Sequence, residues 1–433
     1  MSAFGKAMSV MAAGLVVCGA ARGGDCLEWQ AGVGTGPPGC SYAGMAYDAA
    51  RLRTVWVGGF GQNPLFQVWE WNGVTWSDKT AGAPVEFGRV PGFVYDTARG
   101  VCVLFGWSGA TREYDGTTWV DRNIAGPSAR MQTYMAYDSV RGQTVLFGGG
   151  AGAAPLGDTW TYDGTSWTQH FPSNSPSART AGSMAFDSAR GVVVLHGGFI
   201  GSTQSTTNET WEWDGTTWTL VSVEGPSRFG HRTVYDAQAG LTMIIEGTNG
   251  TAQPSDGEVW GWDGVNWRYV GVSDYPGYGP MMNSAAAYDS LKGEVLLRQP
   301  LQPSPTTSLT YVIESGIPGV QAQPQSVTVE EGCMAALGVT ASSTKPLSYQ
   351  WRKNGIAIPD ATRATLISQG ATLEESGMYD CVLTSACGSV TTQPAFLTVR
   401  PRCVGDSNRD GQRNFQDLNE VLSGFGQACP VAR

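Results

Sequence analysis

The sequence predicts an all-β protein built from several domains. Its 433 residues are enough for more than one hydrophobic core. Glycine is abundant, with 59 residues, and there are 16 tryptophans, whereas charged residues make up only 15% of the chain. This composition is typical of short strands joined by tight turns. A motif that recurs about every 50 residues points to the same class.

The motif begins with an aromatic residue followed by aspartate, and successive aspartates are 42 to 53 residues apart. Its clearest copies are YDSVRGQTVLFGGG from Tyr137 and FDSARGVVVLHGGF from Phe186. Several short strands per unit at this period predict a β-propeller. The aspartates that mark the six units are Asp48, Asp96, Asp138, Asp187, Asp236 and Asp289.

A second motif, WEWDGTTW at 211–218, returns at 69–76, 160–167 and 260–267, with a weaker copy ending at Trp119. Asp-Gly predicts a two-residue hairpin loop that places Trp211 opposite Trp218. The same register places Arg112 opposite Trp119. We expect these hairpins to pack on the next blade. The alternative is a platform of tryptophans that stacks on sugars.

The sixth unit lacks this motif, but residues 25–29 resemble its second half. We therefore expect the N-terminal segment to supply the outer strand of the last blade and to close a ring of six blades.

These units resemble kelch repeats, in the divergent form of the central domain of galactose-oxidase-like proteins, over residues 25–315. The resemblance implies a six-bladed propeller, assigned to residues 22–316. Copper chemistry in that family requires converging His and Tyr ligands. The three histidines, His170, His196 and His231, occupy different repeat positions and are not expected to converge. Cys102 lies in an apolar strand and is expected in the core. We predict no catalytic residues, no organic cofactor site and no enzymatic activity, although a pair of carboxylates from distant blades stays open as a hydrolase site.

Four arginines, Arg89, Arg130, Arg179 and Arg228, precede first strands and should lie on one face of the propeller. One interpretation is that they bind loops and carbonyl groups between blades. The other is a rim that binds anions or glycans.

Residues 317–400 differ in texture and resemble an immunoglobulin-like domain, with Trp351 as the core tryptophan and Tyr379 at the tyrosine corner. The resemblance places Val339 where the first core cysteine usually stands. Cys333 lies six residues earlier, and its pairing with Cys387 or with Cys381 is left open.

Residues 401–433 contain a predicted calcium loop, DSNRDG from Asp406, with Gly411 at the position of the sharp turn. The predicted calcium ligands are Asp406, Asn408, Asp410, Gln412 through its carbonyl, and Asp417. The segment resembles one half of a dockerin repeat, but it is a single copy and has Arg413 where an aliphatic residue is usual. A turn without metal is the alternative. Cys403 and Cys429 flank the segment and are expected to bridge its ends.

The first 21 residues predict a signal peptide, with Lys6, an apolar run at 8–17 and small residues near Ala20. A lipoprotein cut before Cys18 is the alternative, although Val17 is large for that signal. Export would allow disulfides to persist. A net charge of −10 argues against a nucleic-acid partner.

Together these features predict a secreted or cell-surface, non-enzymatic binding, adhesion or scaffold protein. Its propeller would present a ligand-binding face to a protein or glycan, and its calcium segment would dock it to a surface or assembly. The alternative is a carbohydrate-binding or carbohydrate-active propeller protein without a copper site.

Overall fold

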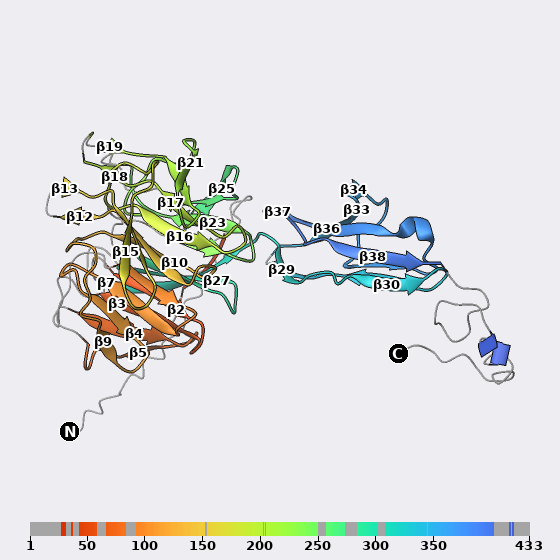
Figure 1. Cartoon of the computed structure of the whole chain (residues 1–433), viewed down its shortest axis with the longest axis horizontal. Coiled ribbons are helices and arrows are strands. Elements are labelled where there is room, and N and C mark those ends of the chain that lie inside the picture. The colour runs from red at the N-terminus through yellow and green to blue at the C-terminus, as the bar shows by residue number, and fades with distance from the viewer. Residues whose placement is uncertain are drawn as a thin grey trace, which may run out of the picture. The chain divides into compact units, whose positions relative to one another are not determined.

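A computed structural model describes residues 27–31, 36–37, 43–58, 66–83, 92–151, 154–201, 203, 205–249, 257–272, 284–300, 308–343, 345–401, 415–416 and 418–419. The expected signal peptide and all five predicted calcium ligands lie outside these residues, as do Arg89, Cys403 and Cys429. The described chain is all-β, with almost no helix, and divides into two compact units between Ile317 and Pro318 (Figure 1).

The first unit contains six four-stranded antiparallel sheets, each of them open. In chain order, and with the strands in sheet order, the first sheet is β2 (Gly44–Asp48), β3 (Arg53–Gly58), β4 (Gln67–Trp71) and β5 (Trp76–Asp78); the second is β6 (Gly92–Asp96), β7 (Val101–Phe105), β8 (Thr111–Tyr114) and β9 (Trp119–Asp121); the third is β10 (Tyr134–Asp138), β11 (Gln143–Phe147), β14 (Thr159–Tyr162) and β15 (Trp167–His170); the fourth is β16 (Ser183–Asp187), β17 (Val192–His196), β20 (Thr210–Trp213) and β21 (Trp218–Ser222); the fifth is β22 (Arg232–Asp236), β23 (Leu241–Ile245), β24 (Glu258–Trp262) and β25 (Trp267–Val272); and the sixth is β26 (Ala285–Asp289), β27 (Glu294–Pro300), β28 (Ser308–Ser315) and β1 (Leu27–Ala31). Two short ribbons, β12 (Gly150–Ala151) with β13 (Ala154–Pro155) and β18 (Phe199–Ile200) with β19 (Ser205–Thr206), extend the third and fourth repeats.

The sixth sheet combines strands from both ends of this unit. β1 pairs antiparallel with β28, with Leu27 opposite Ser315. This confirms the expectation that the N-terminal segment supplies the outer strand of the sixth sheet.

Neighbouring sheets pack face to face, which explains the apolar second strand of each repeat. β17, for example, reads VVVLH and is buried on both faces from Val193 onward. The first strands also contact one another in order: β2 with β6, β6 with β10, β10 with β16, β16 with β22, β22 with β26, and β26 with β2.

The aspartate of each aromatic-Asp pair shapes the turn between the first and second strands. Asp138 Oδ1 accepts hydrogen bonds from the backbone N–H groups of Val140 and Arg141, and its other oxygen pairs with the Arg141 guanidinium at 2.6 Å. The adjacent Tyr137 hydroxyl accepts a bond from the Ala98 N–H of the preceding sheet at 3.4 Å. One motif thus closes a turn and links two sheets.

The Asp-Gly hairpin has a different register from the one we predicted. Trp213 lies opposite Trp218, and Trp211 lies opposite Leu220. Asp214 Oδ1 accepts bonds from the N–H groups of Thr216 and Thr217, each at 2.8 Å, so that four residues rather than two form the turn. The prediction for Arg112 was likewise wrong, because Arg112 lies opposite Asp121.

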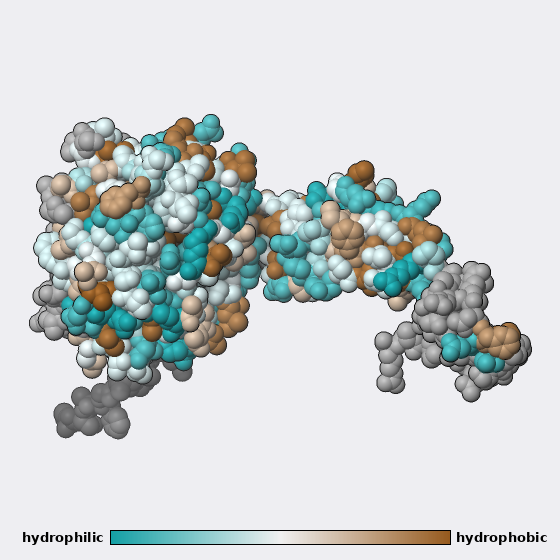
Figure 2. Space-filling model, viewed as in Figure 1, coloured by the Kyte–Doolittle hydropathy of each residue, from teal (hydrophilic) through white to brown (hydrophobic). Residues whose placement is uncertain are grey.

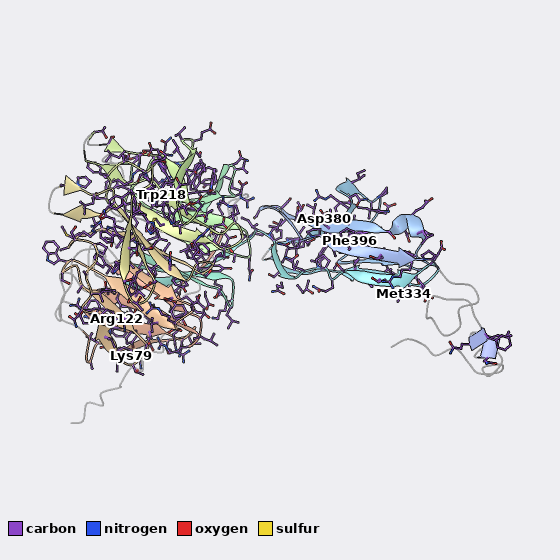
Figure 3. All side chains as sticks on the ribbon, in the orientation of Figure 1. Lys79, Arg122, Trp218, Met334, Asp380 and Phe396 are labelled. Carbon is purple, nitrogen blue, oxygen red and sulfur yellow. The ribbon has the colours of Figure 1, made fainter. Side chains whose placement is uncertain are left out.

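The tryptophans of this motif are building elements of the sheet packing. Trp218 is 1% exposed; its indole N–H donates to Thr159 Oγ1 at 2.9 Å and its ring meets Phe147 at 5.4 Å (Figure 3 labels Trp218). Thr159 and Phe147 belong to the preceding sheet, so the hairpin packs backward rather than on the next sheet. The burial of Trp218 rules out its use as a sugar-stacking platform.

The second unit contains the landmarks expected of an immunoglobulin-like domain. Trp351 is fully buried and donates to the Arg363 carbonyl at 2.8 Å. Tyr379 donates its hydroxyl to the Glu375 carbonyl at 2.6 Å, which is the tyrosine-corner bond. The strands are β29 (Gly319–Ala322), β30 (Val327–Glu330), β31 (Ala335–Gly338), β32 (Thr340–Ser342), β33 (Ser348–Lys353), β34 (Ile356–Ala357), β35 (Thr365–Ser368), β36 (Gly377–Ser385), β37 (Gly388–Thr391) and β38 (Ala395–Arg400), with one 3-10 turn, η1 (Leu373–Glu375).

The cysteines of this domain contradict both pairings left open above. Cys333 is exposed and free, and Cys381 is buried and free. Cys387 is disulfide-bonded, so its partner is a cysteine outside the described residues. Val339 belongs to the same buried cluster as Trp351 and Cys381, where it takes the place of the usual first core cysteine. Hydrophobic packing replaces the usual bridge there.

Candidate functional site

A cavity of about 100 Å³ lies where the first strands of all six sheets begin. Its wall is asymmetric. Four large apolar side chains come from β2, β6, β10 and β16, namely Met45, Phe93, Met135 and Met184. Arg232 and Thr233 of β22, with Thr133 and Ser183, supply charged and hydroxyl groups. The cavity therefore offers both an apolar and a polar, cationic lining.

Arg232 is held in place by main-chain acceptors. Its Nε donates to the Ser284 carbonyl at 2.6 Å and its Nη1 to the His231 carbonyl at 3.1 Å. Burial lowers the pKa of Arg232 to about 10, although Glu246 acts in the opposite direction. The guanidinium remains charged at neutral pH, inside a poorly hydrated site.

Two hydroxyl groups of the cavity lining lack partners. The Oγ1 atoms of Thr133 and Thr233 are buried, and neither forms a hydrogen bond with the described residues. Ser183 Oγ, by contrast, accepts the Thr233 N–H at 3.1 Å. Buried polar atoms without partners are uncommon and often mark the place of a bound molecule.

Glu246 lies next to this cluster in a conformation that glutamate rarely adopts. Its φ is +63°, in the left-handed region, where the third and fourth repeats use Gly148 and Gly197. It is 1% exposed, and burial raises its pKa to about 7, although the Ser284 hydroxyl and Arg232 oppose that shift. Such strain is often retained at functional positions.

Two histidines meet beside this cluster, contrary to our prediction. The rings of His196 and His231 are 5.7 Å apart, because the fourth and fifth sheets are neighbours. Both are fully buried; burial lowers the pKa of His196 to about 4 and that of His231 well below its ordinary value. Both rings are therefore neutral at neutral pH. His170 contacts Trp213 instead.

The sequence contained a signal for this cluster that the repeat alignment passes over. In the fifth repeat, Arg232-Thr233 replaces a pair that reads Gly44-Met45 in the first repeat and Ser183-Met184 in the fourth. Glu246 stands where two repeats have the first of two glycines. A repeat that departs twice from the shared pattern, each time with a polar residue, is a candidate site.

The arginine rim is not an exposed anion site in the described part of the chain. Arg130, Arg179 and Arg228 are 2%, 0% and 7% exposed. Arg179 donates to the Ser177 carbonyl at 2.9 Å and to the Gly197 carbonyl at 3.3 Å, and pairs with Glu209 at 2.5 Å. These bonds lie within one repeat, so the arginines hold loops to their own sheets. Cys102 is fully buried, as expected.

The immunoglobulin-like unit exposes apolar side chains on one sheet. Met378 of β36 and Phe396 of β38 lie directly opposite each other and are 43% and 53% exposed. Beside them, Arg352 forms a two-pronged ion pair with Asp380 at 2.7 and 2.8 Å. Figure 3 labels Phe396 and Asp380, and Figure 2 shows apolar residues at the surface of this unit. We call Met378 and Phe396 the outer apolar pair.

Within the described ranges, no group of three or more His, Cys, Asp and Glu side chains is placed to share a metal ion. Among the same residues, no helix has the length and apolar character needed to cross a membrane.

Comparison with known proteins identifies the second unit. Residues 317–385 match the family model described as immunoglobulin domain. The decoration protein of Escherichia phage T5 is 39% identical over 82 residues, which are 18% of this chain and 50% of that protein. This chain therefore spans about half the length of that relative.

Two solved structures also resemble part of the chain. Chimeric titin Z1Z2 functionalized with a KLER peptide from decorin is 27% identical, covering 20% of this chain and 95% of that chain with a TM-score of 0.18. Tandem Ig repeats of Dlar are 16% identical, covering 25% of this chain and 75% of that chain with a TM-score of 0.19.

Proposed function

We propose that this protein is a secreted or cell-surface, non-enzymatic binding and scaffold protein whose immunoglobulin-like unit attaches it to a proteinaceous surface. The observation that carries the proposal is the outer apolar pair, displayed on a domain of a family matched at residues 317–385. Exposed aromatic and methionine side chains are enriched at protein interfaces. Similarity to a phage decoration protein supports a role in binding rather than catalysis.

The six-sheet unit is proposed to be a kelch-like six-bladed propeller that presents a second binding face. The pairing of β1 with β28 and the contact of β26 with β2 support this arrangement. So does the Trp76 indole N–H, which donates to Thr310 Oγ1 of the sixth sheet at 2.9 Å. A rigid unit of this kind presents loops from a stable scaffold.

The binding proposal predicts that the outer apolar pair determines affinity. The full chain would be tested by biolayer interferometry against arrays of extracellular proteins and of polysaccharides. The double variant Met378→Ser/Phe396→Ser should weaken binding to a protein target by about tenfold or more, since buried aromatic anchors dominate interface energies. Thr398→Ala, an exposed neighbour on β38, is the matched control and should bind normally.

Equal binding by the double variant would exclude this face. Binding to polysaccharides alone would favour the carbohydrate-binding alternative, and release of sugar products from them would contradict a non-enzymatic role. Circular dichroism of both variants would verify that the fold is retained.

The C-terminal segment is proposed to bind calcium and to dock the chain to a surface or assembly. Calorimetric titration of calcium into the full chain should give saturable heat at about one ion per chain. Asp406→Ala/Asp410→Ala should abolish that heat, because it removes two carboxylates at positions 1 and 5 of the loop. Ser407→Ala, at position 2, should bind normally. Absence of heat, or heat that survives the double substitution, would disprove calcium docking.

A further inference from the structure

We propose that the cavity at the start of the six first strands binds a small organic acid, whose carboxylate pairs with Arg232 and whose short apolar chain packs against Met45, Phe93, Met135 and Met184. This site is separate from the outer apolar pair and goes beyond the proposed function, on which it does not depend.

The polar end of the cavity has donors suited to a carboxylate. Arg232 lines the cavity, and its position is fixed by the Ser284 and His231 carbonyls. A guanidinium binds a carboxylate through short charge-assisted hydrogen bonds. Thr133 is 6% exposed and lines the same cavity, and its Oγ1 has no partner in the described chain. The Thr233 hydroxyl is in the same situation. Hydroxyl donors beside a cation complete a site for two carboxylate oxygens.

The rest of the lining selects against a purely inorganic anion. Three methionines and a phenylalanine face a molecule in this space with apolar, adaptable surface. One water occupies roughly 10–15 Å³ of such a volume. A cavity of about 100 Å³ therefore holds a molecule of several non-hydrogen atoms, not a single ion.

The acidic neighbour limits the choice of ligand. Glu246 is the carboxyl group that interacts with Arg232, and burial raises its pKa to about 7. A ligand carboxylate therefore meets a neighbouring acid that is partly protonated near neutral pH. The apolar chain and the free hydroxyls add contacts that Glu246 does not supply to the ligand's side of the guanidinium.

Close backbone approach keeps this space open. A side chain at Gly92 would meet Met135 and the Thr133 hydroxyl, and one at Gly44 would meet Phe93. The small residues at the starts of β2 and β6 thus bring the strands together while the second residue of each strand lines the cavity.

Butyrate is the probe, and butyramide is its neutral counterpart of the same shape. Titration of the full chain, followed by saturation-transfer NMR and by thermal stabilisation, should show saturable binding of butyrate. Butyramide should bind about tenfold more weakly or worse, because it lacks the charge that Arg232 recognises. Sulfate should bind more weakly than butyrate because it lacks an apolar chain.

Two variants test the named contacts. Arg232→Met should weaken butyrate binding by about tenfold or more and should abolish the preference for butyrate over butyramide. Thr233→Val removes a hydroxyl at constant volume, so it tests the site even where Arg232→Met fails to fold, and should weaken butyrate binding by about threefold or more. Arg53→Met, an arginine whose hydrogen bond is exposed, is the matched control and should bind as the unaltered chain does.

Several results would overturn the proposal. They are an absence of saturable butyrate binding, equal binding of butyramide, sulfate binding as tight as butyrate, or full affinity in both cavity variants.

Discussion

Replacement of Trp351 by alanine is expected to destabilise the immunoglobulin-like unit by about 3–5 kcal/mol, the loss typical of a large aromatic side chain removed from a core. Trp351 is fully buried and packs in a cluster that includes Val339, Cys381 and Leu383. It also donates to the Arg363 carbonyl, which the variant leaves without that donor. No inter-sheet disulfide between Val339 and Cys381 limits the unfolded state, so the packing loss appears in full.

Chemical denaturation of the full chain would measure this effect. All members of the Trp351 cluster belong to the second unit, so the transition of the six-sheet unit should stay where it is. Phe396→Ala removes an exposed aromatic residue from the same unit and should change the free energy of unfolding by less than about 1 kcal/mol. A similar loss in both variants would show that burial of Trp351 is not the source of stability.

Replacement of Arg179 by methionine is expected to destabilise the six-sheet unit by about 3 kcal/mol. Arg179 is fully buried and donates to the Ser177 and Gly197 carbonyls while pairing with Glu209. Methionine fills similar space but donates no hydrogen bond. Two carbonyl groups and one carboxylate then lose their donors.

The pH dependence separates the ion pair from the carbonyl bonds. Burial acts to raise the pKa of Glu209, but the hydrogen bond from Arg179 outweighs it and the pKa is lowered overall. A lowered carboxyl pKa contributes stability above its ordinary value of 4.5, and that contribution is lost as the pH falls through the lowered value. The difference between Arg179→Met and the unaltered chain should therefore narrow below pH 4.5 but not vanish.

Denaturation series at several pH values would test this, with Arg53→Met as the exposed control. A difference that is constant with pH would assign the whole effect to the carbonyl bonds. A stability equal to that of the unaltered chain at neutral pH would contradict the structural role of Arg179.

Local patterns in the sequence predicted much of the fold, because they act through neighbouring residues. The aromatic-Asp pairs marked the ends of first strands, and Trp351 and Tyr379 marked the immunoglobulin-like unit. The hairpin register was missed because Asp214 accepts two backbone N–H groups and so extends the turn to four residues. A dipeptide rule based on Asp-Gly does not include that side-chain competition.

The polar cluster was missed for a different reason. His196 and His231 occupy different repeat positions, and only the packing of adjacent sheets brings their rings together. The cavity likewise depends on six strands that are far apart in the chain. Departures of one repeat from the others, such as Arg232 and Glu246, were visible in the sequence, but their proximity was not.

The pairing of β1 with β28 also constrains the order of folding. Leu27 and Ser315 come from opposite ends of the first unit, so this contact closes a very long loop. Such contacts form late, and proteins rich in them fold slowly. Until β1 arrives, the outer side of β28 is an unpaired strand edge that another chain can occupy. A chain that lost residues 27–31 would keep five sheets intact and still be prone to exchange strands with its neighbours.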